Sequence, residues 1–235
     1  MKYRNLRIIG TSHIAVQSIN EIKRIIDESN PGVVAVELDK QRLYALMHPE
    51  ARKKSVSMKD IKYIGITGFV FSLIASWAEK KLGKLVNTKP GDDMMAAAGM
   101  AHKKGIRLEL IDQHVNITLK RLSEAITFRE KLNFVWDIFM SVFFGKHEMK
   151  KLGLQSFDLR RVPSQNVIDI MMKKLRKRYP SLHHVLVKER NEYMAKRLVM
   201  LMKKSNDEVV AVVGAGHAEE ILKIVKSNIN KLDII

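Results

Sequence analysis

The segment RIIGTSHIAVQSINEIKRII (residues 7–26) decides the fold. It opens with an apolar β-branched run that stops at Gly10, and its later isoleucines recur at helical spacing. A second segment of the same form, VVAVVGAGHAEEILKIV, occupies residues 209–225. Each predicts a strand, then Gly-x-x-His, then a helix, so we expect both chain ends to contribute strands to one sheet.

Further apolar runs between these segments predict the rest of the sheet. VVAVELD (33–39) is nearly continuous in apolar residues, as in a strand buried on both faces, and IRLELID (106–112) predicts another strand. The helix predicted between the first two strands makes a βαβ unit with parallel strands and a right-handed crossover. We therefore predict an α/β fold, with a small, mostly parallel β-sheet core formed from both chain ends and a large helical insertion.

The 235 residues fit a single domain over 1–235, with the sheet core in about 1–125 and 205–235 and the helical insertion in about 126–204. Hydrophobic residues make up 46% of the chain, which is enough for a packed core. The chain has no cysteine, so disulfides, thiolate metal sites and a cysteine nucleophile are excluded. A metal site here must use His, Asp and Glu.

The chain is strongly basic, with 42 Lys and Arg against 25 Asp and Glu and a formal net charge of +17. Such a charge attracts polyanions or anionic lipid head groups. The alternative is that runs such as MMKKLRKRYP (171–180) are solvated helix faces. No nucleic-acid-binding motif accompanies the charge, so a nucleic-acid partner is not expected.

The opening residues lead directly into a strand, so we expect no signal peptide and a cytoplasmic protein. Two apolar stretches, 63–78 and 134–145, fall short of the roughly 20 apolar residues that span a bilayer. Each fits a helix buried in protein. The alternative is a basic, partly apolar surface that lies peripherally against an anionic membrane. The same apolar helices also leave a homodimer open.

Several side chains suited to chemistry follow the predicted strands. The carboxyl ends of parallel strands form the crevice where ligands bind. Period-two alternation places the two acids at the end of strand 33–39 on the same side. The residues expected at this edge are His13, Glu37, Asp39, Asp112, His114 and His217.

Two imidazoles and one carboxylate are a donor set for a divalent metal, which lowers the pKa of bound water and makes it nucleophilic near neutral pH. The alternative is that each histidine is an ordinary turn or helix-capping residue. We expect Gly10 and Gly214 to allow tight turns with backbone angles that other residues resist. A dinucleotide-binding reading of VVGAGHAEE is rejected because Glu219 occupies the third glycine position.

Five blocks in order resemble the TraB/PrgY family, which is related to the Tiki metalloproteases and, more distantly, to the erythromycin-esterase/ChaN-like group. They are GTSH, SNPGVVAVELDKQRLYAL, KPGDDMMAAAGMAHKKGIRLELIDQHVNITLKR, KERNEYMAKRL and VVGAGH, and the likeness runs from about residue 8 to 220. The resemblance implies a metal-dependent hydrolase, most naturally a peptidase, with its site at His13, His217 and Glu37. It implies manganese or cobalt, with zinc as an alternative. PrgY-type members are associated instead with pheromone shutdown, the inhibition or sequestration of a peptide pheromone.

The resemblance also covers Arg121, Glu189 and Arg190. On a helix, Glu189 shares a face with Tyr193 and Arg197, so these side chains either line the site or form a salt-bridged helix. Where the family commonly has Asp-Arg-Asp, this chain has Asp-Gln-His at 112–114 and so lacks that arginine. Many relatives carry a membrane-spanning C-terminal region, and we expect this chain to be either a soluble-domain version or a truncated form.

The leading hypothesis is therefore a metal-dependent, peptidase-like enzyme in which His13 and His217 bind the ion. Glu37 is either the third ligand or the general base. Asp39, Asp112 and Arg121 are candidates for orienting an imidazole or binding substrate. The alternative is a peptide-binding or sequestering protein at the membrane surface that uses the same cleft without turnover.

Overall fold

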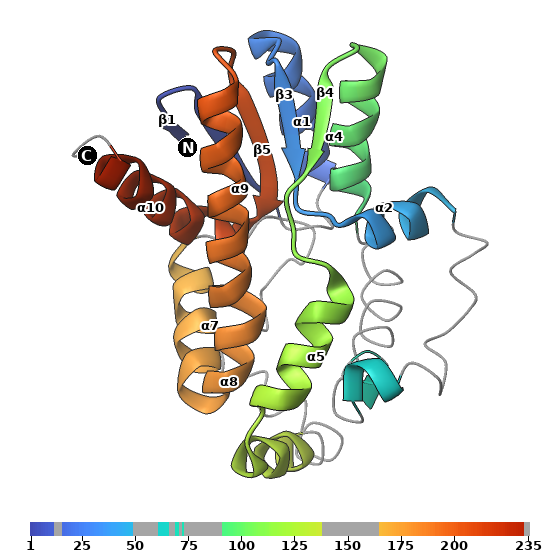
Figure 1. Cartoon of the computed structure of the whole chain (residues 1–235), viewed down its shortest axis with the longest axis vertical. Coiled ribbons are helices and arrows are strands. Elements are labelled where there is room, and N and C mark those ends of the chain that lie inside the picture. Colours follow the sequence, from blue (N-terminus) through green and yellow to red (C-terminus); the bar gives the residue numbers. More distant parts are fainter. Residues whose placement is uncertain are drawn as a thin grey trace.

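The computed structural model describes residues 1–11, 16–48, 61–65, 69–70, 72, 91–137 and 165–232. Its five-stranded sheet has the order β1-β2-β5-β3-β4 (Figure 1). The strands are β1 Lys2–Tyr3, β2 Leu6–Thr11, β3 Val33–Val36, β4 Arg107–Leu110 and β5 Val209–Gly214. β1 pairs antiparallel with β2, and all other pairs are parallel. The predicted α/β fold with a mostly parallel sheet from both chain ends is confirmed.

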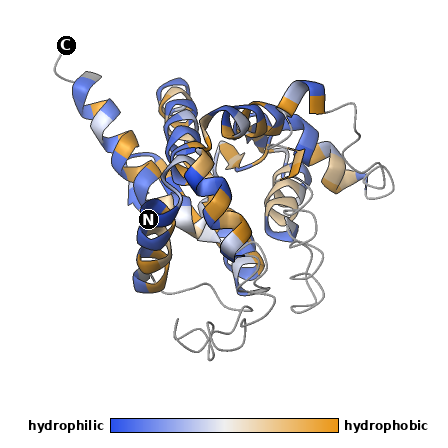
Figure 2. Cartoon of the chain, turned by 90° about the horizontal axis from the view of Figure 1, so that it is seen from below, coloured by the Kyte–Doolittle hydropathy of each residue, from blue (hydrophilic) through white to orange (hydrophobic). Residues whose placement is uncertain are grey.

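Helices surround this sheet on both faces and below it. They are α1 Val16–Ser29, α2 Lys40–Met47, α4 Asp92–Lys103, α5 Val115–Ala125, α7 Gln165–Arg178, α8 Pro180–His183, the π-helical η4 His184–Glu189, α9 Arg190–Lys204 and α10 Ala215–Leu232. Residues 61–65 and 128–137 are also helical. In Figure 1, α5, α7 and α8 lie below the sheet, on the side where β3 and β4 end. Seen from that side, the helices carry both hydrophobic and hydrophilic residues (Figure 2).

The sheet separates two apolar cores, because alternate residues of each strand face opposite sides. Val209, Ala211 and Val213 of β5 pack with α9 and α10 in one core. Val210 and Val212 pack with α1 and α4 in the other. β5 is therefore buried along its whole length, as its continuous apolar sequence predicts.

The helix boundaries follow from local capping. Asp39 accepts hydrogen bonds from the first backbone amides of α2. Gly91 precedes α4 in the left-handed conformation, at φ +94°, and Gly105 follows the same helix at φ +64°. Pro180 is the first residue of α8. These two glycines thus flank α4 at its start and its end.

The structure differs from the sequence prediction at two strands. β1 has only two residues, too few to give a periodic signal. β3 ends at Val36 and not at Asp39, because the chain turns where the amide of Leu38 donates to the carbonyl of Val36, 2.8 Å away. The amide of Glu37 still donates to the Val212 carbonyl at 3.0 Å, so Glu37 remains anchored to the sheet.

The apolar stretches at 63–78 and 134–145 lie largely outside the described residues. In their described parts, Tyr63 and Trp136 are exposed and Ile64 is buried. Within the part of the chain that the structure describes, no helix is both long and apolar enough to span a bilayer.

Candidate functional site

The two strands that carry the Gly-x-x-His motifs lie side by side and end together. In the β2–β5 pair, Gly10 is opposite Val213 and Thr11 is opposite Gly214. β3 lies on the other side of β5, so Glu37 emerges next to the same point. His13 lies outside the described residues, two positions after Thr11 in the sequence. The predicted convergence of the three strand ends is therefore present.

Glu37 is held between the start of α10 and the side chain of Arg190. It follows Ala35 by two residues, and both lie on the side of the sheet that α9 and α10 cover. The backbone amide of Gly214, directly before α10, donates to Glu37 Oε2 at 2.7 Å. The positive end of the α10 dipole favours a carboxylate at this place. Glu37 Oε1 accepts from Arg190 Nη2, and the Glu37 residue is only 2% exposed.

Arg190 joins Glu37 to Asp112. Its Nε donates to Asp112 Oδ1 at 3.0 Å and its Nη2 to Asp112 Oδ2 at 2.7 Å, which is the bidentate arrangement that arginine and carboxylates prefer. Burial lowers the pKa of Arg190, but the charges and hydrogen bonds of Glu37 and Asp112 outweigh it and raise that pKa above its ordinary value. Arg190 is therefore a permanent buried cation.

His217, on the first turn of α10, faces the same pair. Its Nε2 lies 3.5 Å from Arg190 Nη1 and 3.6 Å from Glu37 Oε1, and its Nδ1 lies 2.6 Å from Asn191 Oδ1. Because a guanidinium can only donate, we assign Nε2 as the acceptor. Nδ1 then carries the proton and donates to Asn191, which is fully buried. Asn191 thus fixes both the tautomer and the orientation of the ring.

The other acidic and histidine candidates at this edge have separate roles. Asp112 belongs to the cluster, and its Oδ2 also accepts from Arg42 Nη1 at 2.7 Å. Asp39 caps α2 through the amides of residues 41 and 42. His114 caps α5 by accepting from the amide of residue 116. The chain turns between Glu37 and Asp39. The two side chains therefore do not lie on the same side of one continuous strand.

Arg121 and Glu189 form a second group, between α5 and η4. Arg121 Nη2 donates to Glu189 Oε1 at 2.7 Å, and His184 Nε2 lies 3.4 Å from the same oxygen. Arg197 pairs with Glu109 on β4. Within the described ranges, Glu189 and Arg197 thus each pair with an arginine or a glutamate on another element, α5 or β4. Glu189 and Arg190 are adjacent in sequence but point to different groups at the end of the π-helical turn.

Gly10, the glycine of the first motif, lies in close packing with α10. Gly10 and Gly214 are strand residues, and neither is among the glycines with positive φ. A Cβ on Gly10 would lie 3.2 Å from the backbone of Ala215 and 3.3 Å from Ala218 Cβ. The expectation of strained turns at these glycines was therefore wrong for the described backbone. A side chain at position 10 would thus meet the start of α10 closely.

The donor chemistry of the cluster fits a divalent ion. Within the described ranges, no group of three or more His, Cys, Asp or Glu is arranged to hold a metal. Glu37 Oε1 and His217 Nε2 nevertheless supply one oxygen and one nitrogen 3.6 Å apart, within reach of one ion at the usual bond lengths of about 2 Å. Asn191 is the kind of outer partner that orients a metal-binding histidine. The third predicted donor, His13, is outside the described residues.

Sequence reasoning missed Asn191, Arg42 and the pair formed by Thr11 and Asp93. Asn191 follows Arg190 directly in KERNEYMAKRL, but only the packing of α9 on α10 reveals its contact with the imidazole. Thr11 Oγ1 donates to Asp93 Oδ2 at 2.5 Å, and both residues are buried. Asp93 is on α4, so this bond lies on the opposite side of the sheet from Glu37.

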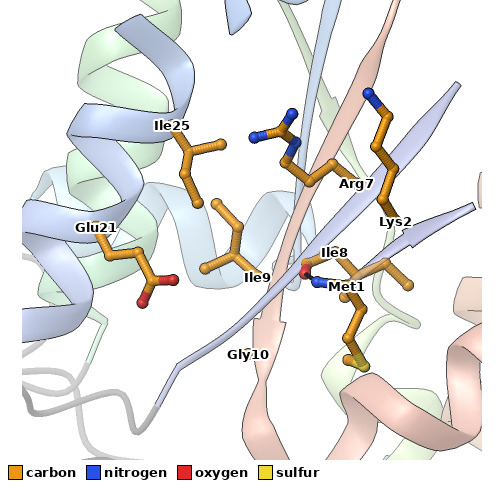
Figure 3. A pocket seen from close by; sticks show the side chains of 8 residues that line it. All are labelled: Met1, Lys2, Arg7, Ile8, Ile9, Gly10, Glu21 and Ile25. Atoms are coloured by element: carbon orange, nitrogen blue, oxygen red, sulfur yellow. Dashed lines mark hydrogen bonds between the residues drawn. The ribbon is translucent and has the colours of Figure 1, made fainter. Parts of the chain in front are cut away.

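A pocket of about 380 Å³ lies at the outer edge of β2 (Figure 3). Its lining comes from the chain start and β2 on one side and from α1 on the other. The lining residues are Met1, Lys2, Arg7, Ile8, Ile9, Gly10, Glu21 and Ile25. Glu37, Arg190 and His217 do not line it, so this pocket and the polar cluster are separate features.

Comparisons with known proteins show the family of this chain. The TraB/PrgY/gumN family profile matches residues 3–228. The uncharacterized protein MJ1365 of Methanocaldococcus jannaschii is 36% identical over 230 residues, which cover 98% of this chain and 55% of that protein. The TraB domain-containing proteins of Mus musculus and Homo sapiens are each 25% identical over 252 residues, covering 97% of this chain and 64% of theirs. The chain thus spans between about half and two thirds of the length of these relatives. It belongs to the TraB/PrgY/gumN family.

Proposed function

We propose that this chain is a metal-dependent hydrolase, most naturally a peptidase, whose site is the cluster of Glu37, Arg190, His217 and Asn191. The observation that carries the proposal is the pairing of Glu37 Oε1 with His217 Nε2 at 3.6 Å. Both atoms bear lone pairs in the assigned tautomer, so their approach is favourable only when a cation lies against both. The site is therefore built for a positive charge, which the guanidinium of Arg190 supplies in this structure.

Each residue of the cluster has its own role in this proposal. His217 Nε2 and Glu37 Oε1, together with His13, would hold the ion, which when bound would supply Lewis acidity at a scissile carbonyl. The Gly214 amide fixes the carboxylate through Oε2, and Asn191 fixes the imidazole through Nδ1. Glu37 thus acts as a ligand in this proposal, because its two oxygens are both committed to fixed positions. Manganese, cobalt and zinc are the candidate metals.

The partner of such a site would be a peptide or protein substrate. The net charge of +17 favours an acidic substrate or an anionic membrane surface, and we propose a cytoplasmic protein that associates peripherally with that surface. A homodimer is compatible with this proposal.

A second candidate function is peptide binding without turnover. It is favoured by the burial of the cluster, because the side chains of Glu37 and His217 are only 3% and 13% exposed. A water nucleophile and a substrate both need room beside the reacting atoms. Binding of intact peptide that survives metal removal would support this second function over hydrolysis.

The test is metal content measured by elemental mass spectrometry after loading with Mn²⁺, Co²⁺ or Zn²⁺ and desalting. We expect about one equivalent in the wild type and loss of the metal in His13→Ala, His217→Ala and Glu37→Gln. His102→Ala is the matched control, since His102 is exposed on the last turn of α4. Cleavage of a peptide library, followed by mass spectrometry, then tests hydrolysis. Folded protein that retains no metal would contradict the proposal and favour peptide binding.

A further inference from the structure

Arg190 occupies the position beside Glu37 where a metal ion would have to bind. Its Nη2 donates to Glu37 Oε1, and its Nη1 lies 3.5 Å from His217 Nε2. These are the same two atoms that the proposed function assigns to the metal. The guanidinium side chain is 14% exposed, so solvent screens this contact weakly.

Asp112 gives Arg190 a second attachment that is independent of Glu37. Two of the guanidinium hydrogen bonds, from Nε and Nη2, go to the two oxygens of Asp112, and a third goes from Nη1 to the Leu186 carbonyl at 3.2 Å. Loss of the bond to Glu37 therefore leaves the bidentate pair with Asp112 complete. Arg190 can give up Glu37 without leaving the site.

Charge counting supports the same exchange. The two carboxylates of Glu37 and Asp112 are matched by the two guanidinium groups of Arg190 and Arg42. Without metal, each of these two carboxylates has a guanidinium beside it, and a buried carboxylate without a cation would be costly. With a divalent ion at Glu37, the guanidinium and the ion would repel each other at close range. Arg190 must therefore both stabilise the metal-free site and weaken metal binding.

Resting on the proposed function, we propose that Arg190 sets the metal affinity of the site. Its guanidinium is the resident cation of Glu37 and His217, and a divalent ion enters by replacing the bond between Nη2 and Glu37 while Asp112 retains the arginine. The affinity for metal is thus determined by how strongly Asp112 competes with Glu37 for the same guanidinium.

The test is calorimetric titration of the full chain with Mn²⁺, comparing wild type with Arg190→Gln. We expect Arg190→Gln to bind Mn²⁺ more tightly by on the order of tenfold or more, because a positive charge beside the ion is removed. Asp112→Asn should shift affinity in the opposite direction, because Arg190 then depends on Glu37. Arg42→Gln is the matched control: Arg42 contacts Asp112 but not Glu37 among its described contacts, so its effect should be smaller.

Two results separate this inference from the proposed function. If the wild type binds Mn²⁺ and Arg190→Gln binds it equally or more weakly, the role of Arg190 is refuted and the metal site stands. If neither protein binds Mn²⁺, both proposals fail. Arg190→Lys covers the case in which Arg190→Gln does not fold: lysine keeps the charge but cannot bridge both carboxylates, and we expect an intermediate gain in affinity. Wild-type or weaker affinity in a folded Arg190→Lys would also overturn the inference.

Discussion

Replacing Glu37 by glutamine tests whether this side chain is held as a carboxylate by two fixed donors. Glutamine has almost the same shape but only one oxygen. In the wild type, Oε1 accepts from Arg190 Nη2 and Oε2 accepts from the Gly214 amide at 2.7 Å. In Glu37→Gln, the new NH₂ group must face one of these two donors. One buried donor then loses its acceptor whichever way the amide turns.

The size of the effect follows from these contacts. An unsatisfied buried donor costs about 1–3 kcal/mol, and a hydrogen bond to a charged group contributes about 1.5–3 kcal/mol. Arg190 keeps its bidentate pair with Asp112, which limits the loss. We therefore expect Glu37→Gln to lower the free energy of unfolding by about 3 kcal/mol, or the Tm by roughly 6–12 °C for a chain of this size.

The measurement is thermal unfolding at pH 7 in chelator, with Glu109→Gln as the control. Glu109 also pairs with two arginines, Arg107 and Arg197, but their side chains are 60% and 37% exposed, so that substitution should cost less than about 1 kcal/mol. The double variant of Glu37→Gln with Arg190→Gln should show a coupling free energy above about 1 kcal/mol. Equal melting of wild type and Glu37→Gln, or coupling within about 0.5 kcal/mol of zero, would refute the reasoning.

Four further substitutions test the packing, the electrostatics and the orientation of the imidazole. Gly10→Val should destabilise the protein by about 1–3 kcal/mol in denaturant titration, since a Cβ there meets α10 at 3.2 Å, whereas Gly99→Ala, with open space around it, should stabilise it by about 0.5–1 kcal/mol. Burial raises the pKa of the Glu130 carboxyl, but hydrogen bonds from residues 127 and 181 lower it by more than burial raises it. The pKa of Glu130 in the folded protein therefore lies below its ordinary value. Its stabilisation is then present above the ordinary pKa of about 4.3 and lost as the pH falls through the folded value, and the Tm gap between wild type and Glu130→Gln should close in acid. Asn191→Leu should weaken Mn²⁺ binding by about 10–100-fold and change the ¹⁵N spectrum of His217 from the Nδ1–H tautomer; an unchanged spectrum in the folded variant would contradict the role of Asn191.

Much of the fold and part of the site could be predicted from local sequence. The apolar run that begins at Val209 predicted a strand, which the structure shows as β5. The repeated Gly-x-x-His pattern correctly predicted that β2 and β5 meet and end together. These features depend on neighbours within a few residues, because strand and helix periodicity and capping are short-range properties.

The partners of the site residues depend on tertiary packing. The position of the Asp39 side chain relative to Glu37 depends on a turn after Val36. A period-two sequence pattern does not predict this turn. Arg190 and Glu37 are 153 positions apart, and the sequence placed both near the site without indicating that they bond to each other. That bond exists because α9 packs on α10 and η4 turns Arg190, and not Glu189, toward the strand ends.

The sequence by itself thus determined the strands that pair in parallel, and that Glu37, Gly10 and Gly214 lie toward one edge of the sheet. Only the tertiary structure decided that a buried arginine neutralises Glu37 and that Asn191 orients His217. The physical reason is the separation along the chain between the residues that interact. Backbone conformation responds to adjacent residues, whereas the pairing of buried charges is fixed by helices that the chain brings together from distant positions.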